Sequence, residues 1–135
     1  MTQPMNLFTV AGRAMSAQLL RLNTTASNLA NAGSVSTTEA GAYRPMKPVF
    51  RTSFDAASGL STVDVKQIVN TDTQPIKRHD PNHPMADADG NVFVSPVDET
   101  QELVEMLETS RQYQNNVEVM QTAKTLVLDT LKLGR

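Results

Sequence analysis

The sequence contains no cysteine, no tryptophan and few aromatic residues of any kind. Without cysteine, disulfides, thiol catalysis and cysteine-based metal sites are all excluded. Aromatic side chains, which dominate burial in most protein cores, make up only 4% of the 135 residues. The chain must therefore build its contacts from Leu, Val, Met and Ala. That composition suits long helices meeting along narrow seams better than one thick core.

The sequence also lacks a basic excess and a long apolar run. A formal net charge of −2 and a pI of about 5.6 give no reason to expect a nucleic-acid partner. No stretch approaches the roughly 18 apolar residues of a membrane span, so we expect no direct membrane insertion. The first 22 residues have neither an early Lys/Arg cluster nor an uninterrupted apolar run. We therefore expect no cleaved secretory signal peptide, and any export must use another route.

The two ends of the chain carry helical patterns. From Met5 to Ala32 there is no proline and one interior glycine, and Gly33 is a plausible C-cap. The segment from Asp98 to Leu133 contains no proline and no glycine, and Asp98 is suited to cap the start of the helix. Each segment has a seam with alternating spacings of three and four. The first seam is Phe8, Ala11, Met15, Gln18, Leu22, Thr25, Leu29 and Ala32. The second is Leu103, Met106, Ser110, Tyr113, Val117, Met120, Lys124, Val127 and Leu131.

The middle of the chain, about residues 34–96, holds six of the seven prolines. The period-two valines predict a strand over 62–70, and 91–94 predicts a short strand after an Asp-Gly turn. Residues 43–54 are extended but contain two prolines, which confine them to an edge strand or a loop. The predicted fold is mainly α with a small β insertion. Residues 1–33 and 97–135 form a coiled-coil-like helical core domain, and 34–96 form a β-rich middle insertion.

The predicted helices are long for a chain of this size. They would span about 40 and 53 Å, whereas a compact globule of this length is only about 35–40 Å across. The longer helix cannot bury its whole seam within such a globule. Either the helices form a hairpin that protrudes, or their seams pack on other chains. Contacts that do not close on themselves would generate a helical tube.

Two polar motifs in the middle region bear on catalysis and metal binding. His79 and His83 lie near Asp80 and Asp87, but prolines between them rule out helical ligand spacing. The 87–91 segment resembles the start of a calcium loop, but Pro96 interrupts the remainder of the pattern, so a turn is favoured. We expect no catalytic residues, no metal site and no cofactor. A small hydrolase using the two histidines is the less favoured alternative.

Several blocks of the sequence resemble flagellar rod and hook proteins, the axial proteins of the bacterial flagellum. The resemblance covers both ends and follows the family order, and residues 80–92 are closest to one of the two short proximal rod subunits. The matching blocks are Asn6–Phe8, Arg21–Ala32, Tyr43–Arg44, Asp80–Val92, Ser110–Val119, Thr122–Lys124 and Leu131–Gly134.

This resemblance implies a structural subunit of the basal-body proximal rod, in the periplasmic drive shaft that transmits torque. It implies self-assembly in a helical tube and export by the flagellar type III system without a cleaved signal. The implied partners are the other proximal rod subunits, the adaptor between the MS ring and the rod, the distal rod protein and the export apparatus. A soluble, cytoplasmic helical-hairpin adaptor is the alternative.

The two seams and the nearby amides supply candidate subunit-interface residues. Side-chain amides are dense near both seams, so we predict intersubunit hydrogen bonds from Asn23, Asn28, Asn31, Asn115 and Asn116. The candidate interface residues are Phe8, Ala11, Met15, Leu22, Asn28, Leu29, Asn31, Leu103, Met106, Tyr113, Asn116, Val117, Met120, Val127 and Leu131.

Overall fold

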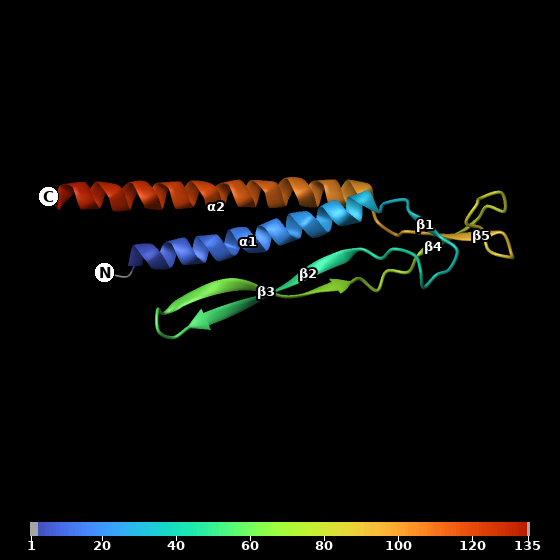
Figure 1. The fold of residues 1–135 in the computed structure, drawn as a ribbon, viewed down its shortest axis with the longest axis horizontal. Coiled ribbons are helices and arrows are strands. Elements are labelled where there is room, and N and C mark those ends of the chain that lie inside the picture. The colour runs from blue at the N-terminus through green and yellow to red at the C-terminus, as the bar shows by residue number, and fades with distance from the viewer. Residues whose placement is uncertain (1–2, 135) are drawn as a thin grey trace. The chain divides into compact units, whose positions relative to one another are not determined.

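The computed structural model describes the backbone of residues 3–134 and the side chains of residues 7–134. Two long helices flank five strands along the chain (Figure 1). The elements are α1 (Gln3–Ala30), β1 (Val35–Ser36), β2 (Met46–Asp55), β3 (Leu60–Asn70), β4 (Ile76–His79), β5 (Asn91–Val94) and α2 (Glu99–Leu133).

The predicted fold class was wrong. The long terminal helices are present, but the strands form two separate sheets, and β2 and β3 alone have 10 and 11 residues. The helices also lack a coiled-coil core, which needs large apolar side chains along its seam. The most buried side chains of α2 are those of Glu102, Thr109 and Ala123, whereas Leu103 and Leu131 of the predicted seam are exposed.

Local capping explains where α2 begins and where α1 ends. Asp98 Oδ1 accepts hydrogen bonds from the backbone N–H groups of Thr100 (3.0 Å) and Gln101 (3.2 Å), which satisfies free donors at the start of α2. Helix α1 closes through Asn31, whose Nδ2 donates to the Ser27 carbonyl at 2.8 Å. Gly33 follows with a φ of 73°, a left-handed conformation that ends a helix at little cost for glycine.

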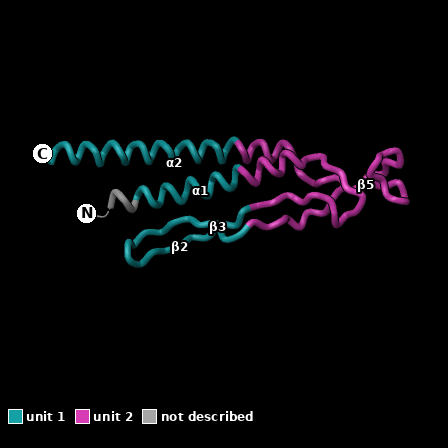
Figure 2. The backbone as a smooth tube through the Cα atoms, viewed as in Figure 1, with its two compact units in different colours: residues 1–22, 48–67, 107–135 teal, residues 23–47, 68–106 magenta. Residues whose placement is uncertain are grey.

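The first of two compact units contains residues 1–22, 48–67 and 107–135 (teal in Figure 2). It holds most of the hairpin in which β2 and β3 form a two-stranded sheet. The hairpin turns between Asp55 and Gly59, where the Gly59 N–H donates to the Asp55 carbonyl at 2.8 Å. The strand predicted over 62–70 is confirmed by β3. The extended segment predicted over 43–54 is confirmed as a strand only from Met46.

The second unit contains residues 23–47 and 68–106 (magenta in Figure 2). Its sheet has the strand order β1-β5-β4, and both pairs are antiparallel. The central strand β5 coincides with the segment predicted over 91–94, and its Val92 is fully buried. Strands β1 and β4 were not predicted, since neither has a hydrophobic alternation that would reveal it.

Within the residues that the structure describes, neither helix has a segment that is both long enough and apolar enough to cross a bilayer.

Candidate subunit interface

Small side chains form the apolar core of the described chain. The buried apolar residues there are Ala11, Ala17, Ala42, Val92 and Ala123, so none exceeds valine in size. Polar side chains are buried alongside them, among them Thr24, Thr25, Asn28 and Thr109. Large apolar side chains, which normally fill a core, instead lie at the surface in both helices and in the β2–β3 hairpin. This distribution is typical of a chain that completes its burial on neighbouring molecules.

The most exposed apolar cluster is at the C-terminal end of α2. Leu126, Leu128, Leu131 and Leu133 are 62%, 46%, 65% and 87% exposed, and we call these four residues the leucine end of α2. At about 100° per residue, Leu126 and Leu133 lie on one side of the helix and Leu128 and Leu131 on the opposite side, so the cluster forms two opposite faces rather than one stripe. A helix with apolar side chains on two opposite faces has to bury both of them. The leucine end therefore suits contacts with more than one neighbour.

The predicted interface residues differ in exposure. Ala11 and Asn28 are buried, Leu103 and Leu131 are exposed, and the others lie between these extremes. The partly exposed ones are Phe8, Met15, Leu22, Leu29, Asn31, Met106, Tyr113, Asn116, Val117, Met120 and Val127. Whether these side chains contact other subunits stays a prediction.

The seam analysis missed three members of the leucine end, namely Leu126, Leu128 and Leu133. None of them falls on the alternating three-four spacing that defined the seam. The density of leucine between residues 126 and 133 is the signal that could have found them. A single three-four spacing finds the residues of one helix face, and it misses apolar residues that lie on other faces.

The amide of Asn28 is engaged within its own chain. Its Oδ1 accepts hydrogen bonds from the Tyr43 hydroxyl and the Met46 backbone N–H, and its Nδ2 donates to the Met46 carbonyl. Asn31 likewise donates to the Ser27 carbonyl. Asn23 and Asn115 are exposed, so their side chains are accessible to a neighbouring subunit.

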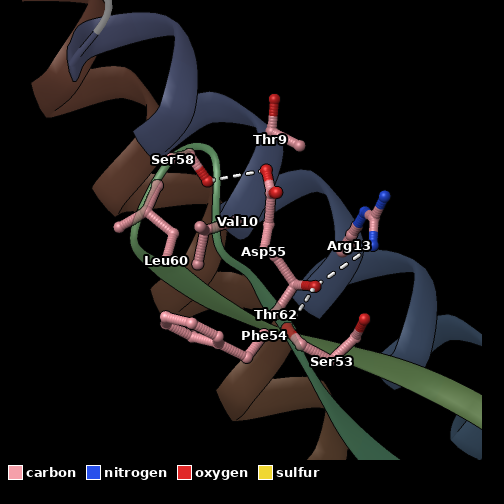
Figure 3. Close-up of a pocket in the computed structure, with 9 residues that line it drawn as sticks. All are labelled: Thr9, Val10, Arg13, Ser53, Phe54, Asp55, Ser58, Leu60 and Thr62. Atoms are coloured by element: carbon pink, nitrogen blue, oxygen red, sulfur yellow. Dashed lines mark hydrogen bonds between the residues drawn. The ribbon is translucent and has the colours of Figure 1, made fainter.

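A shallow pocket in the first unit lies where α1 meets the turn of the β2–β3 hairpin (Figure 3). It has a volume of about 320 Å³ and is lined by Thr9, Val10 and Arg13 of α1 and by hairpin residues between 53 and 62. Arg13 Nη1 donates to Thr62 Oγ1 at 3.1 Å and lies 3.3 Å from Asp64 Oδ1. These contacts hold the hairpin against α1.

The carboxylate of Asp55 is held in its charged form at the edge of this pocket. Its pKa lies below the ordinary value because the Ser58 hydroxyl donates to Oδ2 at 2.8 Å. The Ala57 N–H donates to Oδ1 at 3.0 Å and lowers the pKa further, and the positive charge of Arg13 adds a smaller effect in the same direction. Both carboxylate oxygens thus stabilise the hairpin turn, which gives Asp55 a structural role.

The two histidines of the middle region take part in local hydrogen bonds. His79 Nδ1 lies 3.3 Å from Asn91 Oδ1, and His83 Nδ1 accepts from the Met85 N–H at 3.0 Å. Among the described residues, no group of three or more His, Cys, Asp or Glu side chains is arranged to hold a metal ion. The two histidines therefore contribute to the local structure of the segment that carries them.

The segments that form the two helices match known protein families. Residues 8–35 match the flagella basal body rod protein family, and residues 88–133 match the C-terminal family of the flagellar basal body rod FlgEFG proteins. These two segments contain most of α1 and all of α2. They also include the Arg21–Ala32 and Ser110–Val119 blocks on which the sequence resemblance rested.

Relatives of similar length match nearly the whole chain. The flagellar basal-body rod protein FlgC of Yersinia enterocolitica is 42% identical over 131 residues, which covers 97% of this chain and 98% of the relative. FlgC of Salmonella typhimurium is 42% identical over 133 residues with the same coverage. FlgC of Buchnera aphidicola subsp. Schizaphis graminum is 37% identical over 134 residues, covering 96% and 97%. The chain therefore belongs to the FlgC family of flagellar basal-body rod proteins and is a structural subunit of the rod.

Proposed function

We propose that the chain is a subunit of the proximal rod, within the periplasmic drive shaft that transmits torque from the motor. Residues 1–33 and 97–135 form the helical domain of the tube, and residues 34–96 form its β-rich insertion. Its partners are the other proximal rod subunits, the adaptor between the MS ring and the rod, and the distal rod protein. It reaches the periplasm through the flagellar type III export apparatus without a cleaved signal peptide.

The observation that supports this proposal best is the leucine end of α2. Its four side chains are exposed on two opposite faces of the helix, and burying both faces requires more than one neighbour. Repeated heterologous contacts of that kind build an open helical assembly. Torque in such an assembly is shared among many lateral contacts, so no single site has to carry the load.

A cysteine-labelling experiment tests the location and the export route. The chain has no cysteine, so Ala56→Cys, at an exposed position in the hairpin turn, introduces a unique thiol. In cells with a permeabilised outer membrane, a maleimide that cannot cross the inner membrane should label this variant only when type III export is active. Labelling that persists without the export apparatus would contradict the export route, and a thiol that is never labelled would contradict the periplasmic location.

A second experiment identifies the neighbours. A photo-crosslinking residue at position 128 should capture rod proteins in isolated basal bodies, including other copies of the chain. The same residue at Thr37, which is exposed in the second unit, is the control for non-specific capture. If position 128 captured no rod component, the proposed role of the leucine end would fall.

A further inference from the structure

The structure joins two sequence motifs that the rod function leaves unexplained. Asn28 belongs to the block that closes α1, and Tyr43 begins the short block after the following loop. Asn28 is only 1% exposed, and its Oδ1 accepts the Tyr43 hydroxyl hydrogen at 2.8 Å. Since the tyrosine's only hydroxyl hydrogen is used there, Ser27 donates its own to the Tyr43 oxygen, at 3.3 Å. Neighbouring residues of α1 thus hold Tyr43 from two directions.

The same amide also satisfies both backbone groups of Met46, the first residue of β2. Asn28 Oδ1 accepts from the Met46 N–H at 2.8 Å, and Asn28 Nδ2 donates to the Met46 carbonyl at 2.9 Å. A neighbouring strand would offer the same pair of bonds. The adjacent Pro45 carbonyl accepts from the Thr71 N–H at 2.8 Å, which ties the end of the β3 segment to the same point.

We infer that Asn28 is an intrachain positioning residue, which fixes the first residue of β2 to the last turns of α1 with Tyr43 as its brace. At neutral pH an amide of this length supplies both an acceptor for the Met46 N–H and a donor for the Met46 carbonyl. A carboxylate has no hydrogen for the Met46 carbonyl, and alanine leaves both Met46 groups without these partners, which is costly in a buried place. The inference rests on contacts within one chain, so its failure would leave the rod function untouched.

The exchange rate of the Met46 amide hydrogen reports directly on this clamp. In the full-length chain, Asn28→Ala should speed Met46 exchange roughly tenfold, because one net hydrogen bond is worth about that factor. Asn23→Ala is the matched control, since Asn23 is an exposed asparagine on the same helix, and it should leave the rate unchanged. Tyr43→Phe removes the brace without creating a cavity and should speed exchange roughly threefold. The Tyr43→Phe variant still tests the inference if Asn28→Ala does not fold.

The pH profile of Asn28→Asp separates an amide-specific role from simple packing. At neutral pH the carboxylate cannot donate to the Met46 carbonyl, whereas its protonated form can. Burial and the facing Met46 carbonyl favour the protonated form of this carboxyl, whereas the Tyr43 hydroxyl and the Met46 N–H, which both donate to Oδ1, favour the carboxylate. Wherever the carboxyl is ionised, the variant should exchange at Met46 much faster than the wild type, and the ratio of the two rates should fall toward one as the pH drops through the pKa of the introduced carboxyl.

Three results would overturn the inference. The first is a Met46 amide that exchanges freely in the wild-type chain. The second is a Met46 rate that responds equally to Asn28→Ala and Asn23→Ala, or not at all to Tyr43→Phe. The third is an Asn28→Asp ratio that does not change with pH, which would mean that shape rather than the donor matters.

Discussion

Replacing Leu131 by Asp tests whether the leucine end of α2 drives assembly. Leu131 is 65% exposed, and nothing in the described chain covers the exposed part of its side chain. If neighbouring subunits cover it in the rod, a charge at this position must be buried without a partner. We expect Leu131→Asp to abolish rod assembly and motility while the free chain still folds.

The size of the effect follows from the exposed area. Full burial of a leucine side chain stabilises by about 1.5–3 kcal/mol, so covering the exposed 65% of Leu131 is worth about 1–2 kcal/mol. That corresponds to a roughly 5- to 30-fold change in subunit affinity. The four leucines together expose the equivalent of about two and a half side chains, or about 4–8 kcal/mol per subunit. In the free chain, surface substitutions of this kind change stability by only about 0.5 kcal/mol.

The assay is complementation of a strain that lacks its own FlgC, scored by swimming in soft agar and by electron microscopy of isolated basal bodies. Leu131→Met, which keeps the apolar area, should swim normally, and Leu131→Asn separates loss of apolar area from the added charge. Thermal unfolding of each purified variant checks that the free chain is intact. Normal motility and normal rods in a variant with asparagine at all four positions of the leucine end would refute the reasoning.

Two further predictions concern single turns. In NMR, the Asp55 carboxyl should titrate with a pKa below its ordinary value. In Ser58→Ala this pKa should rise toward the ordinary value, because the Ser58 hydroxyl hydrogen bond is the largest cause of the shift. Because the pKa of Asp55 is lowered in the folded chain, its carboxylate stabilises the fold at neutral pH, and this stabilisation is lost as the pH falls through the folded-state pKa. An unchanged Asp55 pKa in Ser58→Ala would contradict the role given to the Ser58 hydroxyl. Gly90→Ala should lower the free energy of unfolding by about 2 kcal/mol or more, because φ is 75° and the new Cβ would lie 2.9 Å from the Cβ of Pro81. Gly59→Ala has a similar φ of 70° but open space around it, so chemical denaturation should show a loss of only about 1–2 kcal/mol, and equal losses would argue against the Pro81 contact.

Sequence alone determined the features that depend on neighbouring residues. The limits of both helices were predicted to within a few residues, because Asp98 and Gly33 act as caps and neither helix has a proline beyond its first turn. Strands β3 and β5 were found because their valine content and the adjacent Asp-Gly turn are local signals. The family was also apparent in the sequence, since its motifs cover both ends of the chain in the right order.

Only the tertiary structure decided which sides of the elements are buried and which segments meet. The seam through Leu103 and Leu131 has a helical period, but α2 buries Glu102, Thr109 and Ala123 instead. Periodicity records where apolar residues lie and does not say whether the chain's own segments or other molecules cover them. Strand β4 is exposed along its length and is a strand only because β5 lies beside it.

The hydrogen bonds of Asn28 to Met46 and Tyr43 could not be predicted from the neighbouring sequence either. An amide near the end of a helix can serve a neighbouring subunit or its own chain, and its side-chain chemistry is the same in both cases. The fold decides between them by bringing the backbone of Met46 to within 2.9 Å of that amide, 18 residues along the chain. Which partner a hydrogen-bonding side chain finds depends on non-local geometry. The sequence therefore determined which side chains could bond or be buried, and the tertiary structure decided what they bond to.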